Sequence, residues 1–279
     1  MGNVYGWLLV LAMLLAVAAV VTGSVSLSCT DKNRVGLHLP ATIRRATPTL
    51  VQDIISPVVD SKKSLFLTYK NFSSVPKRVF DNLKALAPDW NIYFFDDDAC
   101  LSFLDTTYGD QVLQRYASLR KGAHRADLFR YCVLYRFGGM YADIKVEFKK
   151  PLDEWVARAG GRNFTVLSKI PKTIFQGIVY CDKQSPVILQ CISHMLRTPA
   201  HKYASHYLLA TKQFYDELQV GSPKPLKAGA TSPGWYLYEE KALKCVNEQS
   251  DFRGACHKIL DADGTLMANT RYSDFGRAW

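Results

Sequence analysis

Hydrophobic residues occupy every position from 7 to 21, and the apolar segment extends to residues 4–22. This length is close to the roughly 20 residues that cross a bilayer core, so we expect a transmembrane segment over residues 1–23. The small residues that follow would also suit cleavage of a secretory signal peptide. We favour an uncleaved signal-anchor over a cleaved signal and over a buried core helix.

The pattern changes again after this segment. Residues 24–60 contain isolated prolines and show no sustained periodicity, so we interpret them as a stem, followed by one globular domain over residues 61–279. Within the domain, short apolar runs alternate with segments of helical spacing, which is typical of an α/β fold with a mixed, mostly parallel sheet. The predicted strands are 65–69, 91–95 and 174–180, with a hairpin over 259–268. The predicted helices follow Pro76 and cover 99–105, 111–119, 123–137 and 187–196.

Residues 121–148 combine both periodicities. Helical spacing to Phe137 places Asp127 and Arg130 three residues apart, and the glycine pair at 138–139 ends the helix. Apolar and charged residues then alternate, which predicts a strand over 141–148 with one buried and one charged face. The predicted charged face carries Tyr141, Asp143, Lys145 and Glu147.

Charge and motifs narrow the chemistry. The chain has 35 Lys and Arg against 25 Asp and Glu, a net charge of +10, which favours anionic partners. A composition of 48% hydrophobic and 22% charged residues excludes a disordered, collagen-like or coiled-coil protein. The sequence contains no P-loop, His-Glu-x-x-His or Gly-x-Ser-x-Gly motif, and no basic–aromatic module typical of RNA binding. A phosphate-bearing small molecule is therefore the expected ligand, and nucleic acid is not.

The segment 127–143 suits such a ligand, although a charged strand face is also compatible with a solvated edge. Carboxylates bind ribose hydroxyls or a divalent cation, and cationic side chains bind a diphosphate. The segment resembles glycosyltransferase family 32, whose DXD-containing sugar-binding region reads roughly Ser-Asp-x-x-Arg-Tyr-x-x-Leu-Tyr-x-x-Gly-Gly-x-Tyr-x-Asp-x-Asp. The residues that match in register are Asp127, Arg130, Tyr131, Leu134, Tyr135, Gly138, Gly139, Tyr141 and Asp143. The resemblance covers residues 64–279 and weakens after residue 185.

The resemblance implies a GT-A-like fold and transfer of a hexose, with mannose one candidate, from a nucleotide-sugar to a glycan or lipid-linked acceptor. It further implies retention of anomeric configuration and a requirement for Mn²⁺ or Mg²⁺ bound at Asp143. The candidate catalytic residues are Asp143, which the resemblance implies, and Lys145, which stands close to it in this sequence. The implied donor-binding residues are Thr68, Tyr69, Asp127, Arg130, Tyr141 and Asp143. The alternative is an inactive lumenal relative that binds carbohydrate or nucleotide-sugar.

Lys145 departs from the family pattern, because it stands at the second aspartate of the DXD motif. Its ammonium group would repel a divalent cation, yet it could itself bind a phosphate as a point charge. Lys145 therefore either replaces part of the metal's role, or turns outward while Asp143 binds metal together with a ligand from residues 269–274. The resemblance favours the second alternative.

The resemblance and the apolar segment together imply a single-pass type II protein of the Golgi or another secretory-pathway membrane, with secretion after signal cleavage as the alternative. Asn71 and Asn163 each begin an N-glycosylation triplet, which agrees with a lumenal domain. Lys32 and Arg34 follow the apolar segment, whereas no basic residue precedes it. The positive-inside rule, applied alone, would leave the domain in the cytoplasm.

Treatment of the expressed protein with an N-glycosidase distinguishes these orientations. If the domain is lumenal, N-glycosidase treatment increases the gel mobility of the wild-type chain. The same treatment leaves the mobility of an Asn71→Gln, Asn163→Gln double variant unchanged. An unchanged mobility of the wild-type chain would instead favour the cytoplasmic orientation.

Overall fold

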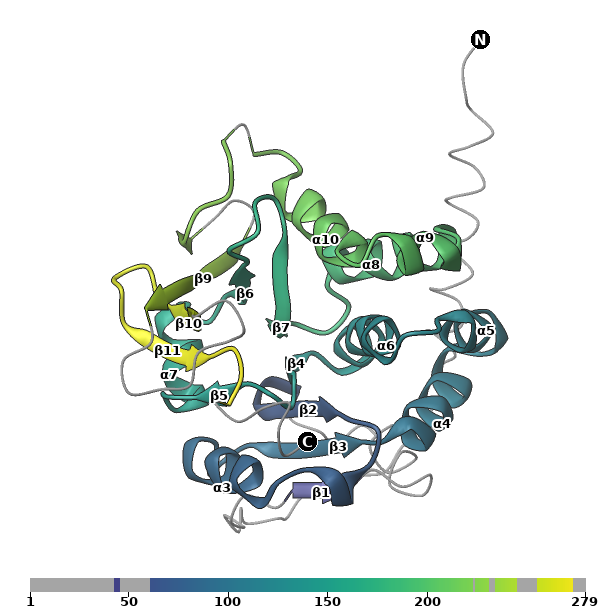
Figure 1. Ribbon diagram of the computed structural model, residues 1–279, viewed down its shortest axis with the longest axis horizontal. Coiled ribbons are helices and arrows are strands. Elements are labelled where there is room, and N and C mark those ends of the chain that lie inside the picture. Colours follow the sequence, from purple (N-terminus) through teal and green to yellow (C-terminus); the bar gives the residue numbers. More distant parts are fainter. Residues whose placement is uncertain (1–42, 46–60, 223, 231–233, 245–254, 273–279) are drawn as a thin grey trace, which may run out of the picture.

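The computed structural model describes residues 43–45, 61–222, 224–230, 234–244 and 255–272 (Figure 1). The predicted membrane segment and almost all of the predicted stem lie outside these residues. Within the described part of the chain, every helix is too short or too polar to cross a membrane.

The domain is built on one curled, mixed β-sheet. Its strands, in chain order, are β1 (Ile43–Arg45), β2 (Ser64–Thr68), β3 (Asn91–Phe95), β4 (Gly139–Ala142), β5 (Glu147–Phe148), β6 (Asn163–Leu167), β7 (Ile174–Cys181), β8 (Gly229–Ala230), β9 (Trp235–Lys244), β10 (Ala255–Leu260) and β11 (Leu266–Asn269). Their order across the sheet is β1-β3-β2-β4-β7-β6-β9-β10-β11-β5, and β8 pairs with β9. The predicted α/β class is therefore confirmed.

The prediction of a mostly parallel sheet is wrong for the second half of the chain. Strands β1, β3, β2 and β4 run parallel, as do β6 and β9, whereas the other described pairs are antiparallel. The reason is the length of the connections. Only six residues separate β6 from β7, and five separate β10 from β11, which is too short for a crossover helix between parallel strands.

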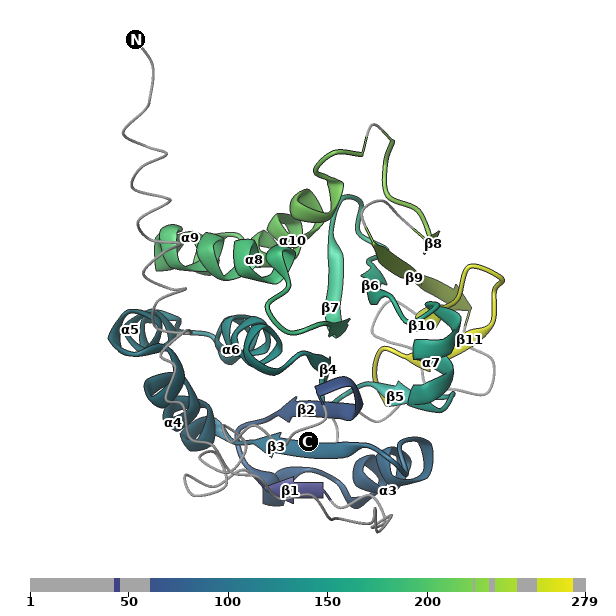
Figure 2. The ribbon, with the colours of Figure 1, turned by 180° about the vertical axis from the view of Figure 1, so that it is seen from behind.

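Helices cover both faces of this sheet. The helices, in chain order, are α3 (Lys77–Leu86), α4 (Asp97–Tyr108), α5 (Asp110–Ser118), α6 (Gly122–Phe137), α7 (Leu152–Arg158), α8 (Pro186–Arg197), α9 (Ala200–Ser205) and α10 (Leu209–Gln219), with short 3₁₀ turns η1 (Ser61–Lys63) and η2 (Phe72–Ser74). Both views show α3 and α7 on one side and the remaining helices on the other (Figures 1 and 2). Alternate residues of β2 accordingly enter two cores, Phe66 on the side of α6 and Leu65 on the side of α3.

Local sequence signals account for the first half of the domain. The predicted strand 91–95 coincides with β3, and the next helix, α4, begins where the Asp96 side chain accepts a hydrogen bond from the Ala99 N–H (3.0 Å). The predicted helix 123–137 matches α6, which ends at Gly138 with a φ of 70°. The predicted hairpin over 259–268 is also confirmed, as β10 and β11.

The continuous strand predicted over residues 141–148 is wrong. The chain leaves the sheet after β4 and makes a turn, in which the Val146 N–H donates to the Asp143 carbonyl (2.9 Å). The Lys145 carbonyl accepts from the Tyr272 N–H (3.0 Å), so a C-terminal segment supplies a partner that a neighbouring strand would otherwise provide. Burial nevertheless alternates through the turn, with Ile144 buried between two partly exposed neighbours. The periodicity thus predicted the burial of residues 142–148 correctly and the backbone wrongly, and Tyr141, predicted on the charged face, is buried.

This turn explains why the sheet is curled. Strand β4 lies in the middle of the sheet, whereas β5 pairs with β11 at its far edge. The chain from Ala142 to Glu147 can span at most about 17 Å when fully extended. The far edge must therefore bend back towards β4, and residues 143–146 lie where the two parts of the sheet meet.

Gly138 and Gly109 allow a test of the junction between α6 and β4. Each glycine ends a helix, and their backbone angles are nearly the same, with φ/ψ of 70°/−159° at Gly138 and 69°/−168° at Gly109. Their surroundings differ. A Cβ on Gly138 would lie 2.6 Å from the Lys183 backbone nitrogen, whereas a Cβ on Gly109 would have no neighbour within 4 Å. Alanine at either position should cost about 1–3 kcal/mol in backbone strain. Gly138→Ala should lose roughly 1–3 kcal/mol more through overpacking, measured as the free energy of unfolding in urea. Equal losses in the two variants would show that the close approach is unimportant.

Candidate active site

A cavity of about 510 Å³ opens beside α6, β4 and β7. This volume lies within the roughly 300–1,000 Å³ of small-molecule sites. All of the side chains predicted to bind the donor or take part in catalysis line it, namely Thr68, Tyr69, Asp127, Arg130, Tyr141, Asp143 and Lys145. The structure thus brings together residues that the sequence separates by up to 77 positions. Their roles in binding and catalysis stay a prediction.

Arg130 lies at the centre of the polar wall of this cavity. Its side chain is only 4% exposed, and one terminal nitrogen lies 3.2 Å from Asp127 Oδ1 and 3.2 Å from Asp143 Oδ1. The other terminal nitrogen donates to the Gln176 carbonyl of β7 (2.8 Å), and the guanidinium lies 4.7 Å from the centre of the Tyr141 ring. A single side chain on α6 therefore links the helix, the turn after β4, and β7.

This geometry differs from that of an exposed ion pair on the surface of a helix, because the side chains of Asp127 and Arg130 are both buried. An exposed pair three residues apart contributes only a few tenths of a kcal/mol. Asp127 is instead buried and accepts a hydrogen bond from Gln176 Nε2 (2.7 Å), and it also lies 3.4 Å from His124 Nδ1. Removing one member of a buried charged network typically costs about 3–5 kcal/mol, because the remaining charges are left uncompensated.

Asp143 is held by groups on three sides. Oδ1 accepts hydrogen bonds from Arg130 and from the Tyr141 hydroxyl, each at 3.2 Å, and Oδ2 lies 3.5 Å from Lys145 Nζ. Burial would raise the pKa of the Asp143 carboxyl, but the positive charges of Arg130 and Lys145 and the Tyr141 hydrogen bond outweigh burial and hold the pKa below its usual value. Asp143 is consequently ionised at neutral pH.

Thr68 and Tyr69 reach the cavity because they stand at the carboxyl end of β2. The Tyr69 N–H donates to the Phe95 carbonyl (3.2 Å), which continues the pairing with β3 beyond the end of the strand. Thr68 Oγ1 lies 3.3 Å from the sulfur of Cys100. Burial raises the pKa of the Cys100 thiol to about 12, so this thiol stays protonated and is not a candidate nucleophile.

Sequence reasoning missed other residues of the cavity, among them Gln176, Gly177 and Glu240. Gln176 is the one polar side chain within the apolar run of β7, a signal that could have identified it. A Cβ on Gly177 would lie 3.0 Å from Asp143 Oδ2. Glu240 belongs to a strand of mixed polarity and gives no such signal; its Oε2 accepts from the Ser168 hydroxyl (3.0 Å) and from the Lys169 N–H (3.2 Å).

The side chains around Asp143 do not fit the divalent cation that the family resemblance implies. Both Asp143 oxygens already face donors or positive charges, from Arg130, Tyr141 and Lys145. Among the described residues, no group of three or more His, Cys, Asp or Glu side chains could share a metal ion. Asn269, the expected start of a second ligand segment, instead donates to Glu147 Oε2 (2.8 Å) and does not line the cavity. Asp274 lies outside the described residues.

The two glycosylation triplets lie away from the cavity. Asn71 is exposed, and its Oδ1 accepts from the Ser74 N–H (2.8 Å) at the start of η2. Asn163 is half-buried at the start of β6, and its Oδ1 accepts from the Asp182 N–H (2.9 Å). In each case the amide nitrogen that would carry a glycan is distinct from the bonded oxygen.

Comparisons with known proteins place this geometry in a family context. Residues 74–160 match the family described as "Glycosyltransferase sugar-binding region containing DXD motif". The initiation-specific alpha-1,6-mannosyltransferase of Candida albicans is 30% identical over 105 residues, which is 35% of this chain and 27% of that protein. The inositol phosphoceramide mannosyltransferase 3 of Schizosaccharomyces pombe is 30% identical over 129 residues, which is 44% of this chain and 33% of that protein.

A solved structure, the PaToxG glycosyltransferase, superposes with a TM-score of 0.42 at 14% identity, covering 63% of this chain and 79% of that one. This chain spans about a quarter to a third of the length of the two mannosyltransferases described above. The matched segment includes Asp127, Arg130, Tyr141 and Asp143, the polar wall of the cavity. On these residues and the sequence matches, the chain resembles the glycosyltransferases of this family, and residues 74–160, about a third of the chain, match its sugar-binding region.

Proposed function

We propose that the chain is a glycosyltransferase that moves a hexose from a nucleotide-sugar to a glycan or lipid-linked acceptor. The observation that carries this proposal is the buried Asp127–Arg130–Asp143 network, which lines the cavity and lies within the segment that matches the family. A mannosyl donor is the first candidate, because the curated relatives described above are named mannosyltransferases.

The proposed reaction needs charge stabilisation more than a protein nucleophile. The bond between the anomeric carbon and the diphosphate oxygen breaks, and its electron pair leaves with the diphosphate. A bond forms between that carbon and the acceptor oxygen, whose proton passes to the departing diphosphate. In this arrangement Asp127 accepts hydrogen bonds from hydroxyl groups of the nucleotide-sugar, and Arg130 orients Asp127 and Asp143. Thr68 and Tyr69 contact the nucleotide-sugar at the end of β2.

Several finer features belong to the same proposal. We propose a GT-A-like fold for residues 61–279, a stem over 24–60, and a signal-anchor over 1–23 in a Golgi or other secretory-pathway membrane. Retention of anomeric configuration follows from the family resemblance. The mixed sheet, covered by helices on both faces, supports the proposed fold. The uninterrupted apolar run at 7–21 supports the proposed signal-anchor.

A second candidate function is an inactive relative that binds a nucleotide-sugar without transferring the sugar. Lys145 favours this candidate, because it stands at the second aspartate of the DXD motif and pairs with the first. The two candidates share the same cavity and differ only in turnover.

A panel of nucleotide-sugars tests both candidates. Guanosine diphosphate mannose and uridine diphosphate hexoses are added to the full-length protein together with glycan and lipid-linked acceptors, and the melting temperature and the release of nucleoside diphosphate are measured. For a transferase, one donor stabilises the fold by RT ln(1 + [L]/Kd), which raises the melting temperature, and nucleoside diphosphate is released. Stabilisation without release identifies the binding relative, and neither effect from any donor contradicts the proposal. Asp143→Asn should lose release, whereas Asp105→Asn, an exposed control on α4, should not.

The structural contribution of Asp143 is measurable separately. Because the pKa of Asp143 is lower in the folded protein, its ionised form stabilises the fold above the unfolded pKa, and this stabilisation is lost as pH falls through the folded pKa. Asp143→Asn should therefore melt at a lower temperature than the wild type at pH 7. The difference should begin to shrink as pH falls through the unfolded pKa of about 4, and should vanish below the lower pKa of the folded protein. A difference that is as large at about pH 2 as at pH 7 would show that the loss does not depend on the charge.

A further inference from the structure

Compared with an aspartate at the same position, Lys145 raises the charge of the cavity wall by two, which is the charge of a divalent cation. The network consists of two carboxylates, Asp127 and Asp143, and two cations, Arg130 and Lys145, within 3.5 Å of one another in pairs. It is therefore neutral overall. An aspartate at position 145, as in the DXD pattern, would leave three carboxylates around one guanidinium, a net charge of −2. A divalent cation would be needed to restore neutrality beside an incoming diphosphate.

The position of Lys145 is set by its backbone. Its carbonyl accepts from the Tyr272 N–H (3.0 Å), and the flanking turn is closed by the bond from the Val146 N–H to the Asp143 carbonyl. Its side chain is 36% exposed and its ammonium lies 6.0 Å from the centre of the Phe175 ring, which also lines the cavity. A long, partly exposed side chain on a fixed backbone can turn towards a ligand without a change in the fold.

The wider lining supports an anion at this place. The cations that line the cavity are Lys70, Arg125, Arg130, Lys145 and Lys169, and the carboxylates are Asp97, Asp127, Asp143 and Glu240. Both arginines lie within 4 Å of carboxylates, Arg125 at 3.7 Å from Asp97. Among the described residues, the carboxylate within 4 Å of the Lys145 ammonium is that of Asp143, which also contacts Arg130, so the charge of Lys145 is only partly compensated.

We propose that the Lys145 ammonium binds the donor diphosphate in the place where DXD glycosyltransferases use a divalent cation, so that the nucleotide binds without metal. This inference rests on the proposed function. The positive charge of Lys145 offsets the negative charge that the diphosphate gains as the glycosidic bond breaks.

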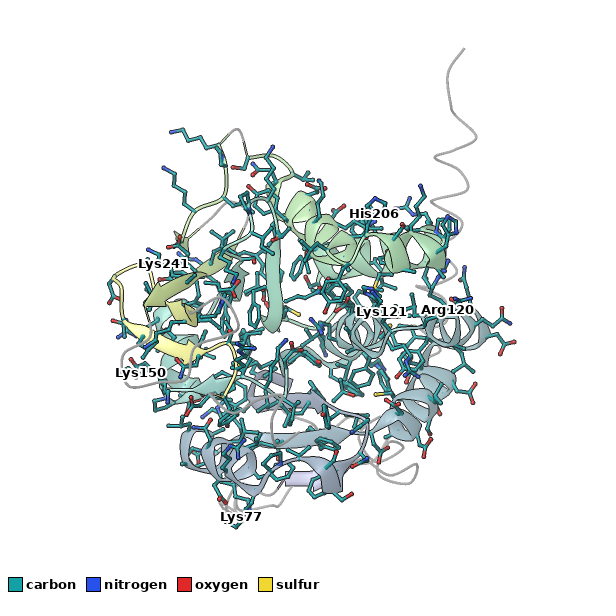
Figure 3. The ribbon with its side chains drawn as sticks, viewed as in Figure 1. Lys77, Arg120, Lys121, Lys150, His206 and Lys241 are labelled. Atoms are coloured by element: carbon teal, nitrogen blue, oxygen red, sulfur yellow. The ribbon has the colours of Figure 1, made fainter. Side chains whose placement is uncertain are left out.

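Binding of nucleoside diphosphate to the full-length protein, measured by calorimetry in EDTA and in Mn²⁺, tests the inference without relying on turnover. The probes are guanosine and uridine diphosphate. The wild type should bind one of them with the same Kd in both conditions. Lys145→Met, which keeps the side-chain stem, should weaken binding in EDTA at least tenfold, and Lys145→Arg should not. Lys150→Met is the matched control, since Lys150 is 37% exposed, pairs with Glu154, and lies away from the cavity at the edge of the molecule (Figure 3).

The outcomes separate this inference from the proposed function. Binding by the wild type that requires Mn²⁺, or an unchanged Kd for Lys145→Met in EDTA, overturns the role of Lys145 and leaves the proposed function intact. Stronger binding in Mn²⁺ by Lys145→Asp, but not by the wild type, supports the charge argument, whereas equal strengthening of both overturns it. Absence of binding by the folded wild type in either condition overturns the proposed function, and this inference with it.

Discussion

The buried guanidinium of Arg130 is the interaction on which the arrangement of the cavity depends. Arg130 projects from α6 and contacts a carboxylate of its own helix, a carboxylate of the turn after β4, and a backbone carbonyl of β7. Burial would lower the pKa of Arg130, but the surrounding Tyr141, Asp143 and Asp127 raise it above its ordinary value. The guanidinium is therefore always charged, and its fixed planar geometry holds two acids close together that would otherwise repel each other.

The curvature of the sheet brings the remaining parts of the site to this network. The short link between β4 and β5 connects the middle of the sheet to its far edge, and it carries Asp143 and Lys145. The same curvature brings β7 and β9 to the cavity, which explains how Gln176 and Glu240 line it although neither belongs to the matched segment. Asp143 and Lys145 thus lie in a turn between two parts of the sheet, where the backbone hydrogen bonds do not belong to a regular strand pairing.

Gly138 and Gly177 are needed at this junction because neighbouring groups leave no room for a side chain at either position. Gly138 lets the chain turn from α6 into β4 while passing within van der Waals distance of the Lys183 backbone. Gly177 leaves room for the Asp143 carboxylate against β7. A methyl group at either position would press on groups that support the cavity, so the polar wall depends on missing side chains as well as on charged ones.

The sequence by itself determined the local elements and the composition of the site. Strand β3, helix α6 and its glycine end, and the alternation of burial over 142–148 follow from periodicity and capping, which act over a few residues. Tertiary structure alone decided the direction of the later strands, the turn that replaces a strand at 143–146, and the depth of burial of Arg130. It also decided that Lys145 pairs with Asp143, because their separation of 3.5 Å depends on a turn closed by Tyr272 and Val146 and on no pattern that neighbouring residues express.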